Sequence, residues 1–401
     1  MTISVQQFLF PIGAVAAAVT IPGAIELMLV TSGAIFGRSR SLPRNPRRGR
    51  LAAIVPAHNE EALIGRCVAS LLASAASGTQ CSVIVVADNC TDATAWRARE
   101  AGADVLVRHD SLHRGKGCAL RFAFDRLIEG GFDGFLIVDA DSVVSANLVP
   151  EVLAALAGGA NAVQTRYRVR PPLNSSRRRV MDVAFLAFNV LRPKGRDGWG
   201  LSAGILGNGF ALSRQTLQEV PYSADSIVED LEYHLLLVNA NKKVRFANAA
   251  TVYGDMPEDA GAGVSQRARW EGGRARVARV WVPKLAAQLA HGKLSVAEPL
   301  LELLTLPLAY MVLIVSALCV FPTGPLRWYG AAVMGLIVVY VASAVSLGGR
   351  VGESLTALAA APVYVAWKLR SLGAIVHASR AEAQWIRTPR DSHPTGKVPH
   401  V

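Results

Sequence analysis

The stretch "FLIVDADSVV", residues 135–144, runs an apolar segment straight into two aspartates, Asp139 and Asp141. Residues two apart in an extended chain point the same way, so the two carboxylates are expected to lie side by side. Like charges at that spacing repel, and a hard divalent cation between them would remove the repulsion. An acidic turn after a strand is the alternative interpretation, and the flanking sequence has to decide between the two.

Strand-like and helix-like segments alternate around this stretch. Continuous apolar runs predict strands, and apolar residues at spacings of three and four predict helices. Apolar strands without polar alternation are typical of parallel sheets covered on both faces, so the sequence predicts an α/β fold. The expected strands span 51–55, 81–87, 104–108 and 134–139, and the expected helices span 61–75, 91–103 and 116–130.

Polar residues follow the three clearest strands, as "PAHNEE" (56–61), "ADNCTD" (87–92) and "DADS" (139–142). Ligands of open parallel sheets bind at the carboxyl ends of the strands. This placement favours a binding site over an ordinary acidic turn.

Two common nucleotide motifs are missing from the sequence. No G-x-G-x-x-G follows the first strand, so a dinucleotide site is not supported. The segment "HRGKG" (113–117) lacks the glycine spacing of a Walker A loop. It still offers Arg114 and Lys116 to phosphate oxygens, although a solvated basic turn would have the same composition.

The composition is apolar and basic. Of 401 residues 51% are hydrophobic, and the net charge is +12. Much of the excess lies in 38–50, 177–179 and 267–279, which suits phosphate ligands, anionic lipid or nucleic acid. No nucleic-acid-binding motif accompanies it, so no nucleic-acid partner is expected. The five cysteines form no C-x-x-C pair, which argues against zinc and suggests a reducing compartment.

Long apolar segments predict membrane helices at 8–36, 296–321 and 328–347. The first could be a secretory signal, but no positive segment precedes it and a basic cluster follows it. Glu26 within it is costly in lipid, so it should face another helix. The apolar run 356–367 is short and carries a proline, which suggests a re-entrant or interfacial segment.

The positive-inside rule predicts the orientation. The arginines of 38–50 should be cytoplasmic, which places the N-terminus outside and residues 50–295 in the cytoplasm. The basic, amphipathic stretch 277–294 is expected to lie on the membrane surface. The sequence thus predicts a multi-pass protein of the inner (plasma) membrane whose large middle part is cytoplasmic.

Seven short motifs occur in order between residues 54 and 270. They are "IVPAHNEE", "VVADNCTDAT", "RGKG", "VDADS", "GNGFALSR", "VEDLEYHLLL" and "QRARW". Together they resemble the family 2 inverting glycosyltransferases, which have a GT-A-type, nucleotide-diphospho-sugar-binding domain. The resemblance covers roughly 50–282. The flanking apolar segments resemble the membrane-bound polysaccharide synthase branch, which includes hyaluronan, chitin-oligosaccharide and cellulose synthases.

The resemblance implies a donor site. Asp88 would contact the nucleotide base, usually uracil, while Ala57 and Glu60 would frame the nucleoside. Lys116 would lie near the diphosphate. The sequence departs from the family at Ala87, where many members carry an acidic residue, and this departure weakens the nucleoside assignment rather than the fold.

The metal and the base follow from the same resemblance. Asp139 and Asp141 would bind Mg²⁺ or Mn²⁺, with Asp141 the more direct ligand and Asp139 also on the donor side. Asp230 would be the catalytic base, with Glu229 beside it. The chemistry asks for these groups, because the leaving diphosphate needs a cation and the attacking hydroxyl needs a carboxylate to take its proton. An acidic first turn of a helix would explain Glu229 and Asp230 equally, and both readings can hold.

The acceptor and diphosphate side would use Gln266, Arg269 and Trp270, which match a Gln-x-x-Arg-Trp pattern associated with processive transfer, and Gly209 of "GNGF". Trp270 offers a flat face to a sugar ring. An aromatic residue at a membrane interface is the alternative reading of the same position.

The expected function is transfer of a sugar from a nucleoside-diphosphate sugar, most simply a UDP-sugar, to a glycan or lipid-linked acceptor in extracellular polysaccharide synthesis. Transfer of one sugar to a lipid acceptor is the alternative, and an inactive nucleotide-binding partner protein is a third reading. Membrane lipid and an export partner or a second copy of the chain are further expected partners. The expected segments are a membrane helix (1–37), a basic linker (38–50), a catalytic domain (51–276), an interface helix (277–295), two membrane helices (296–349) and a re-entrant or interfacial segment with a cytoplasmic tail (350–401).

Overall fold

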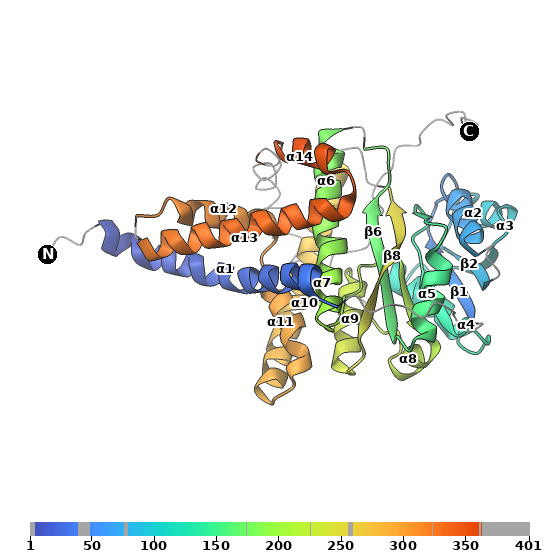
Figure 1. Cartoon of the computed structure of the whole chain (residues 1–401). Coiled ribbons are helices and arrows are strands. Elements are labelled where there is room, and N and C mark those ends of the chain that lie inside the picture. Colours follow the sequence, from blue (N-terminus) through green and yellow to red (C-terminus); the bar gives the residue numbers. More distant parts are fainter. Residues whose placement is uncertain are drawn as a thin grey trace.

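The computed structural model joins an α/β body to a bundle of long helices that extends from one side (Figure 1). The body carries the strands, and the bundle contains the N-terminal helix α1 (Val5–Phe36). The structure describes residues 5–38, 49–75, 79–173, 175–224, 226–255, 260–322, 324–360 and 362.

One eight-stranded sheet forms the centre of the body, in the order β3-β2-β1-β4-β7-β6-β8-β5. Strands β1 to β4 are parallel, β7 is antiparallel to both of its neighbours, and β6 and β8 are parallel to each other. The carboxyl ends of β1, β2, β3, β4, β6 and β8 therefore meet at one edge. The strands are β1 (Arg50–Ala57), β2 (Gln80–Asp88), β3 (Asp104–Arg108), β4 (Gly134–Ile137), β5 (Val143–Val144), β6 (Ala162–Val169), β7 (Phe210–Ser213) and β8 (Val244–Gly254).

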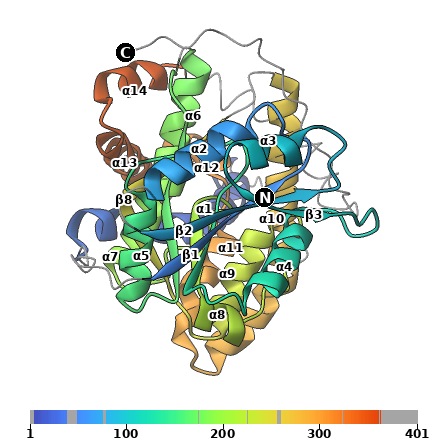
Figure 2. The ribbon, with the colours of Figure 1, turned by 90° about the vertical axis from the view of Figure 1, so that its right-hand side faces the viewer.

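Helices cover both faces of the sheet, as the continuous apolar strands predict. Alternate residues of β1 enter different cores: Ile54 packs in one and Val55 in the other. Figure 2 shows α2 and α3 on one side of β1 and β2, with α4 and α9 on the other. The helices of the body are α2 (Ile64–Ala75), α3 (Thr94–Glu100), α4 (Lys116–Leu127), α5 (Leu148–Ala157), α6 (Ser176–Leu186), α7 (Arg192–Gly198), α8 (Arg214–Glu219) and α9 (Glu229–Asn239).

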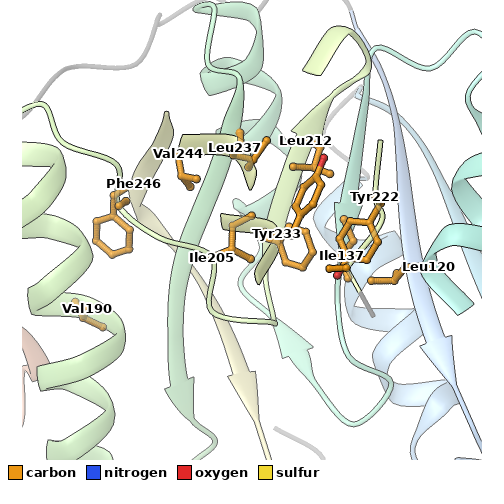
Figure 3. Close-up of a cluster of buried hydrophobic side chains, with 14 of the residues drawn as sticks. Leu120, Ile137, Val190, Ile205, Leu212, Tyr222, Tyr233, Leu237, Val244 and Phe246 are labelled. Atoms are coloured by element: carbon orange, nitrogen blue, oxygen red, sulfur yellow. The ribbon is translucent and has the colours of Figure 1, made fainter. Parts of the chain in front are cut away.

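The core beneath α9 holds that helix against the sheet (Figure 3). Tyr233 is fully buried, and its ring lies 4.5 Å from that of Tyr222. Its hydroxyl donates to the carbonyl of Val220 at 2.6 Å. Because Tyr233 lies one turn after the start of α9, this packing positions the first turn of the helix at the edge of the sheet.

The C-terminal helices extend the body and complete the bundle. Helices α1, α12 and α13 run side by side away from the sheet (Figure 1). Thr20 of α1 and Tyr329 of α13 share a hydrogen bond of 2.9 Å between their hydroxyl groups. The helices are α10 (Ala260–Ala290), α11 (Ala297–Leu304), α12 (Leu308–Cys319), α13 (Gly324–Gly348) and α14 (Val351–Leu358).

Among the described residues, Leu9–Phe36 and Gly324–Gly348 are long and apolar enough to cross a membrane. They correspond to the predicted helices at 8–36 and 328–347. The predicted helix 296–321 is instead two helices, α11 and α12, bent by 74° at their junction. The cause is local: Pro307 has no backbone N–H, and the residue before a proline is disfavoured in a helix.

Three other predicted segments differ from the structure or lie partly outside it. The basic stretch 277–294 was expected to be a separate helix, but most of it forms the second half of α10. Residues 39–48 of the basic linker lie outside the described residues. The segment 356–367 is described only as far as α14, a short turn at 359–360 and residue 362.

Glu26 lies inside the protein and faces other helices, as predicted. Its carboxylate is fully buried and lies 2.7 Å from the guanidinium of Arg196 and 3.1 Å from that of Arg192 on α7. Arg196 also pairs with Glu298 and Glu302 of α11. Acidic and basic groups therefore neutralise one another where α1 meets the body.

Candidate active site

The parallel strands bring the predicted donor residues to one edge of the sheet. Ala57 ends β1, Asp88 ends β2, and Asp139 comes two residues after β4. In-register pairing of β1 with β2 and β4 explains why these positions are neighbours. The first turns of α4 and α9 face the same edge and supply the remaining charges of the site.

Lys116 lies between several acidic groups. It is the first residue of α4, directly after Gly115, whose φ of 125° suits glycine. Its ammonium group donates to Oδ1 of Asp139 at 2.5 Å and to the carbonyl of Gly207. Burial alone would lower the pKa of Lys116, but the carboxylates of Asp139, Glu229 and Asp230 raise it overall. The solvated basic turn considered for this segment does not describe Lys116, whose side chain is 21% exposed.

Glu229 and Asp230 begin α9 and face this lysine. Burial raises the pKa of Glu229 to about 7, an effect strengthened by Asp230 and opposed by Lys116. Burial also raises the pKa of Asp230, which Lys116 again opposes. A Cβ built on Gly207 would lie 3.0 Å from Oδ2 of Asp230. Lys116 contacts Asp139 and the carbonyl of Gly207, and Gly207 borders Asp230, so Asp139 and Asp230 belong to one site.

The acidic turn is braced by Asn208, a residue of "GNGF" that sequence reasoning did not single out. Its Oδ1 accepts from the backbone N–H of Asp139 at 3.1 Å, and its Nδ2 donates to Oγ of Ser142 at 2.9 Å. The Ser142 hydroxyl in turn donates to Oδ1 of Asp141 at 3.2 Å. An asparagine between two glycines, followed by a short apolar segment, is the sequence signal that could have identified it.

The residues at this turn fit a divalent cation that is shared with a substrate. Asp139 and Asp141 supply hard oxygen ligands, and Asp141 is held further by Arg66, which donates to its backbone carbonyl at 3.2 Å. No group of three or more His, Cys, Asp or Glu in the described part of the chain forms a complete metal cage. Mg²⁺ and similar ions are commonly bound by one or two carboxylates together with substrate phosphates. The donor set matches that arrangement.

The predicted nucleoside side of the site contains a buried ion pair. Asp88 lies 2.7 Å from the guanidinium of Arg108, which ends β3. Burial raises the pKa of Asp88, and its hydrogen bond and ion pair with Arg108 oppose this rise. Arg108 was not predicted, although parallel pairing of β2 with β3 places the two residues opposite each other. The backbone N–H of Glu60 donates to Oγ1 of Thr94 at 2.7 Å, which holds the loop after β1 against α3.

The predicted acceptor residues do not all lie at the site. Gly209 is buried in the sheet, and a Cβ there would lie 2.5 Å from Oγ1 of Thr165. Its surroundings are therefore filled by protein, whereas Gly207 of the same motif lies next to Asp230. A direct acceptor contact at Gly209 does not fit this packing.

The Gln-x-x-Arg-Trp residues lie on α10. The side chains of Gln266 and Arg269 are outside the described residues, while Trp270 is 40% exposed. One turn later, a Cβ on Gly273 would lie 2.9 Å from Val228, the residue before Glu229. This contact brings the α10 segment next to the first turn of α9.

Comparisons with known proteins agree with this geometry. A family model described as glycosyltransferase-like family 2 matches residues 46–273, which is more than half of the chain. The probable glycosyltransferase YdaM of Bacillus subtilis (strain 168) is 25% identical over 233 residues, covering 56% of this chain and 55% of that protein. The chain thus spans about half the length of that relative. Protein RfbJ of Shigella flexneri is 31% identical over 103 residues, covering 26% of this chain and 73% of RfbJ.

A solved structure shares the fold over most of the chain. The mannosyltransferase PcManGT from Pyrobaculum calidifontis, solved with GDP-Man and Mn²⁺, covers 89% of this chain and 99% of its own, at 17% identity and a TM-score of 0.53. The body is therefore an α/β, GT-A-like fold. With a family model matched across the sheet and both acidic turns, the chain belongs to the glycosyltransferase-like family 2.

Proposed function

We propose that the protein transfers a sugar from a nucleoside-diphosphate sugar to a hydroxyl group of a glycan or lipid-linked acceptor, with inversion at the anomeric carbon. The observation that carries the proposal is the cluster in which Lys116 lies among Asp139, Glu229 and Asp230. It combines a positive group for a leaving diphosphate with a half-buried carboxylate for an incoming hydroxyl. Family membership supports the same chemistry.

The residues divide the reaction between them. The oxygen of the acceptor hydroxyl bonds to the anomeric carbon, and Asp230 accepts the proton of that hydroxyl. The bond from that carbon to the diphosphate breaks, and the diphosphate leaves with the bonding electrons. Lys116 stabilises the charge on the leaving group. Asp139 and Asp141 would hold Mg²⁺ or Mn²⁺, which would supply further charge stabilisation to the leaving group. Asp88, Ala57 and Glu60 are proposed to frame the nucleoside.

The raised pKa of the Glu229–Asp230 pair supports a role in proton transfer. A carboxylate whose pKa approaches neutrality is a stronger base than an exposed one, while still ionised in part at neutral pH. Lys116 opposes the rise and so keeps a fraction of the pair charged. Gln266, Arg269 and Trp270 are proposed to contact the acceptor or the diphosphate from α10.

The helical bundle supports a membrane setting. Leu9–Phe36 and Gly324–Gly348 are proposed to span the inner membrane, with the sheet in the cytoplasm and the product entering an extracellular polysaccharide. At most three spans are available in the described chain, which is few for a translocation path. If the product is a polymer, this number favours a second copy of the chain or an export partner that completes the path. The same number supports transfer of a single sugar to a lipid acceptor as the second candidate function.

The test replaces Asp230 by Asn in the full-length protein purified in detergent. We expect transfer of labelled sugar to fall by at least about a hundredfold, because the base is lost, while Mn²⁺-dependent binding of UDP- or GDP-sugars is retained. A panel of these donors in thermal-shift measurements identifies the nucleotide. Asp125→Asn, on the exposed side of α4, is the matched control and should transfer normally. Substantial activity in Asp230→Asn would contradict the assignment of the base, and product length separates polymerisation from single addition.

A further inference from the structure

A row of arginines follows the last part of β6 toward the active-site edge. Arg166, Arg168 and Arg170 are two residues apart and therefore project from one face of the strand. Arg66 of α2 joins them, because it and Arg170 pair with the same carboxylate, that of Asp255, at 2.7 and 2.5 Å. We call these four residues, Arg66, Arg166, Arg168 and Arg170, the arginine row.

Within the part of the chain that the structure describes, the arginine row carries more positive charge than its acidic neighbours balance. Asp255 pairs with Arg66 and Arg170, and Asp182 of α6 pairs with Arg168 at 2.8 Å. Among the described residues, two carboxylates thus pair with three of the four guanidinium groups. No carboxylate of the described residues lies within ion-pair distance of Arg166, whose Nη2 donates to the neutral carbonyl of Leu347 at 2.7 Å.

Buried nitrogen atoms of the row also lack partners. Nε of Arg66, Arg166 and Arg168 is buried without a hydrogen-bond acceptor in the structure described. Burial and the neighbouring Arg168 lower the pKa of Arg166. Buried guanidinium nitrogens with unused N–H groups are costly, and phosphate oxygens are, with carboxylates, the acceptors that the planar geometry of arginine fits.

The two ends of the row lie at informative places. At one end Arg166 and Arg168 donate to the carbonyls of Leu347 and Gly348, the last residues of α13. Among the described residues, that helix is one of the two that are long and apolar enough to cross a membrane. At the other end Arg66 donates to the backbone carbonyl of Asp141 at 3.2 Å. The row therefore connects the end of a candidate membrane helix to the acidic turn.

We propose that the arginine row binds the phosphate of a membrane lipid that carries the acceptor sugar. The inference rests on the proposed transferase function and specifies its acceptor. A lipid anchored beside α13 would hold its phosphate where the helix ends, and a sugar linked to that phosphate would extend along the row toward Asp141. A neutral glycan would leave the excess positive charge of the row unpaired, so the charge favours the lipid phosphate.

The binding test uses the full chain in detergent with EDTA present, so that metal-dependent binding at the donor site is suppressed. A long-chain polyisoprenyl monophosphate is the probe, and polyisoprenol of the same length is its phosphate-free counterpart. We expect the phosphate lipid to bind at least about tenfold more tightly than the alcohol, because charge-assisted hydrogen bonds to phosphate are strong. Equal affinity of the two lipids would overturn the proposal.

Variants locate the bound phosphate. Arg166→Gln and Arg170→Gln should each weaken binding of the phosphate lipid by about tenfold, and Arg166→Lys, which keeps the charge, should recover part of the loss. Arg97→Gln is the matched control, because Arg97 is an exposed arginine of α3 paired with Glu100. Nucleotide-induced thermal shifts with Mn²⁺ verify that each variant is folded. If Arg166→Gln and Arg170→Gln are both folded and bind the phosphate lipid with unchanged affinity, the arginine row is not the phosphate-binding site.

Two further experiments identify which phosphate compound the row binds and separate failure of the acceptor proposal from failure of the transferase proposal. Inorganic phosphate or phosphatidylglycerol vesicles that compete as well as the probe lipid would overturn a specific acceptor site. With donor and Mn²⁺ present, transfer to a phosphate-free glycoside is compared with transfer to a lipid phosphate that carries the same sugar. Equal rates for the two acceptors would overturn the acceptor assignment but would not contradict the proposed transferase function. Loss of nucleotide-sugar turnover with every acceptor would instead overturn the transferase function itself.

Discussion

The ammonium group of Lys116 lies 2.5 Å from a carboxylate oxygen of Asp139. The same ammonium donates to the carbonyl of Gly207, next to which Asp230 is placed. One lysine therefore holds together an acidic turn after a strand and the first turn of a helix about ninety residues later. Without this positive charge, Asp139, Glu229 and Asp230 would form a cluster of three partly buried acids with no compensating cation from Lys116.

Gly207 keeps space for the proposed base. Its φ is 76°, and an added Cβ would lie 3.0 Å from Oδ2 of Asp230. Gly207→Ala should displace that carboxylate and lower kcat by roughly tenfold to a hundredfold, because small misplacements of reacting groups are costly. Steady-state kinetics with labelled donor measure the effect, and the KM for the donor should change little.

Gly159→Ala is the matched control for this experiment. Gly159 has a φ of 87°, so alanine pays a similar backbone penalty of about 1–2 kcal/mol there, but nothing lies within 4 Å of the added Cβ. Both variants should lose stability, and only Gly207→Ala should lose turnover. Equal kcat values in the two variants would show that strain, rather than displacement of Asp230, explains the result.

Glu229 predicts a pH-dependent stability. Its folded-state pKa of about 7 lies above the ordinary value of 4.5, so the folded protein binds this proton more tightly. The associated stability is present below about pH 4.5 and is lost as the pH rises through about 7. Glu229→Gln removes this loss and should be more stable than the parent at pH 8, by roughly 3 kcal/mol at most.

Thermal unfolding in detergent between pH 4.5 and 8 tests this prediction. The difference in Tm between Glu229→Gln and the parent should grow across that interval and level off above pH 7. A difference of the same size at every pH would mean that packing, and not ionisation of Glu229, is responsible.

Asn208 is expected to position the proposed metal ligands. Asn208→Ala removes the acceptor for the Asp139 N–H and the donor to Ser142, which costs about 1–3 kcal/mol in stability and loosens the turn that carries Asp141. We expect Mn²⁺-dependent affinity for UDP or GDP to fall by about tenfold in calorimetric titrations. Asn161→Ala, which precedes β6 and lies outside the site, should bind normally. Matching affinities in the two variants would remove Asn208 from this role.

Glu26 should contribute strongly to stability. Glu26→Gln leaves Arg192 and Arg196 without one of their buried carboxylates, and breaking such pairs costs about 3–5 kcal/mol. Glu353→Gln is the control, since Glu353 is 54% exposed and lies 3.8 Å from Arg350, a pair worth at most about 1 kcal/mol. Thermal unfolding in detergent compares the two, and shifts of equal size would show that the buried cluster carries no special weight.

Much of the body was readable from the sequence because its strands are continuous and apolar. The expected strand 51–55 lies within β1 (Arg50–Ala57), and the expected strand 104–108 coincides with β3. Strand β7 was not predicted. It has only four residues, and its place between β4 and β6 depends on pairing with Ile137 and Gln164, which are distant in sequence. The break before Pro307 was also missed, because apolar composition continues through it.

The site was predicted less completely than the fold. The order of the motifs predicted Lys116, Asp139 and Asp230 as site residues. No sequence pattern shows that the ammonium group of Lys116 contacts both Asp139 and the carbonyl of Gly207. Arg108 was missed because its partner, Asp88, is twenty residues away and adjacent only through the pairing of β2 with β3. Gly209 was chosen over Gly207, since spacing alone does not distinguish a buried glycine from one that borders a carboxylate.

The charge cluster around Glu26 has a consequence for biosynthesis. Arg192 is synthesised 166 residues after Glu26, and the glutamates of α11 follow later still. Until translation has passed these partners, the carboxylate of α1 lacks the two guanidinium groups that pair with it in the folded protein. Helix α1 therefore cannot complete these ion pairs before α7 and α11 have been synthesised, and substitutions at Glu26 should reduce the yield of mature protein even where purified molecules remain active.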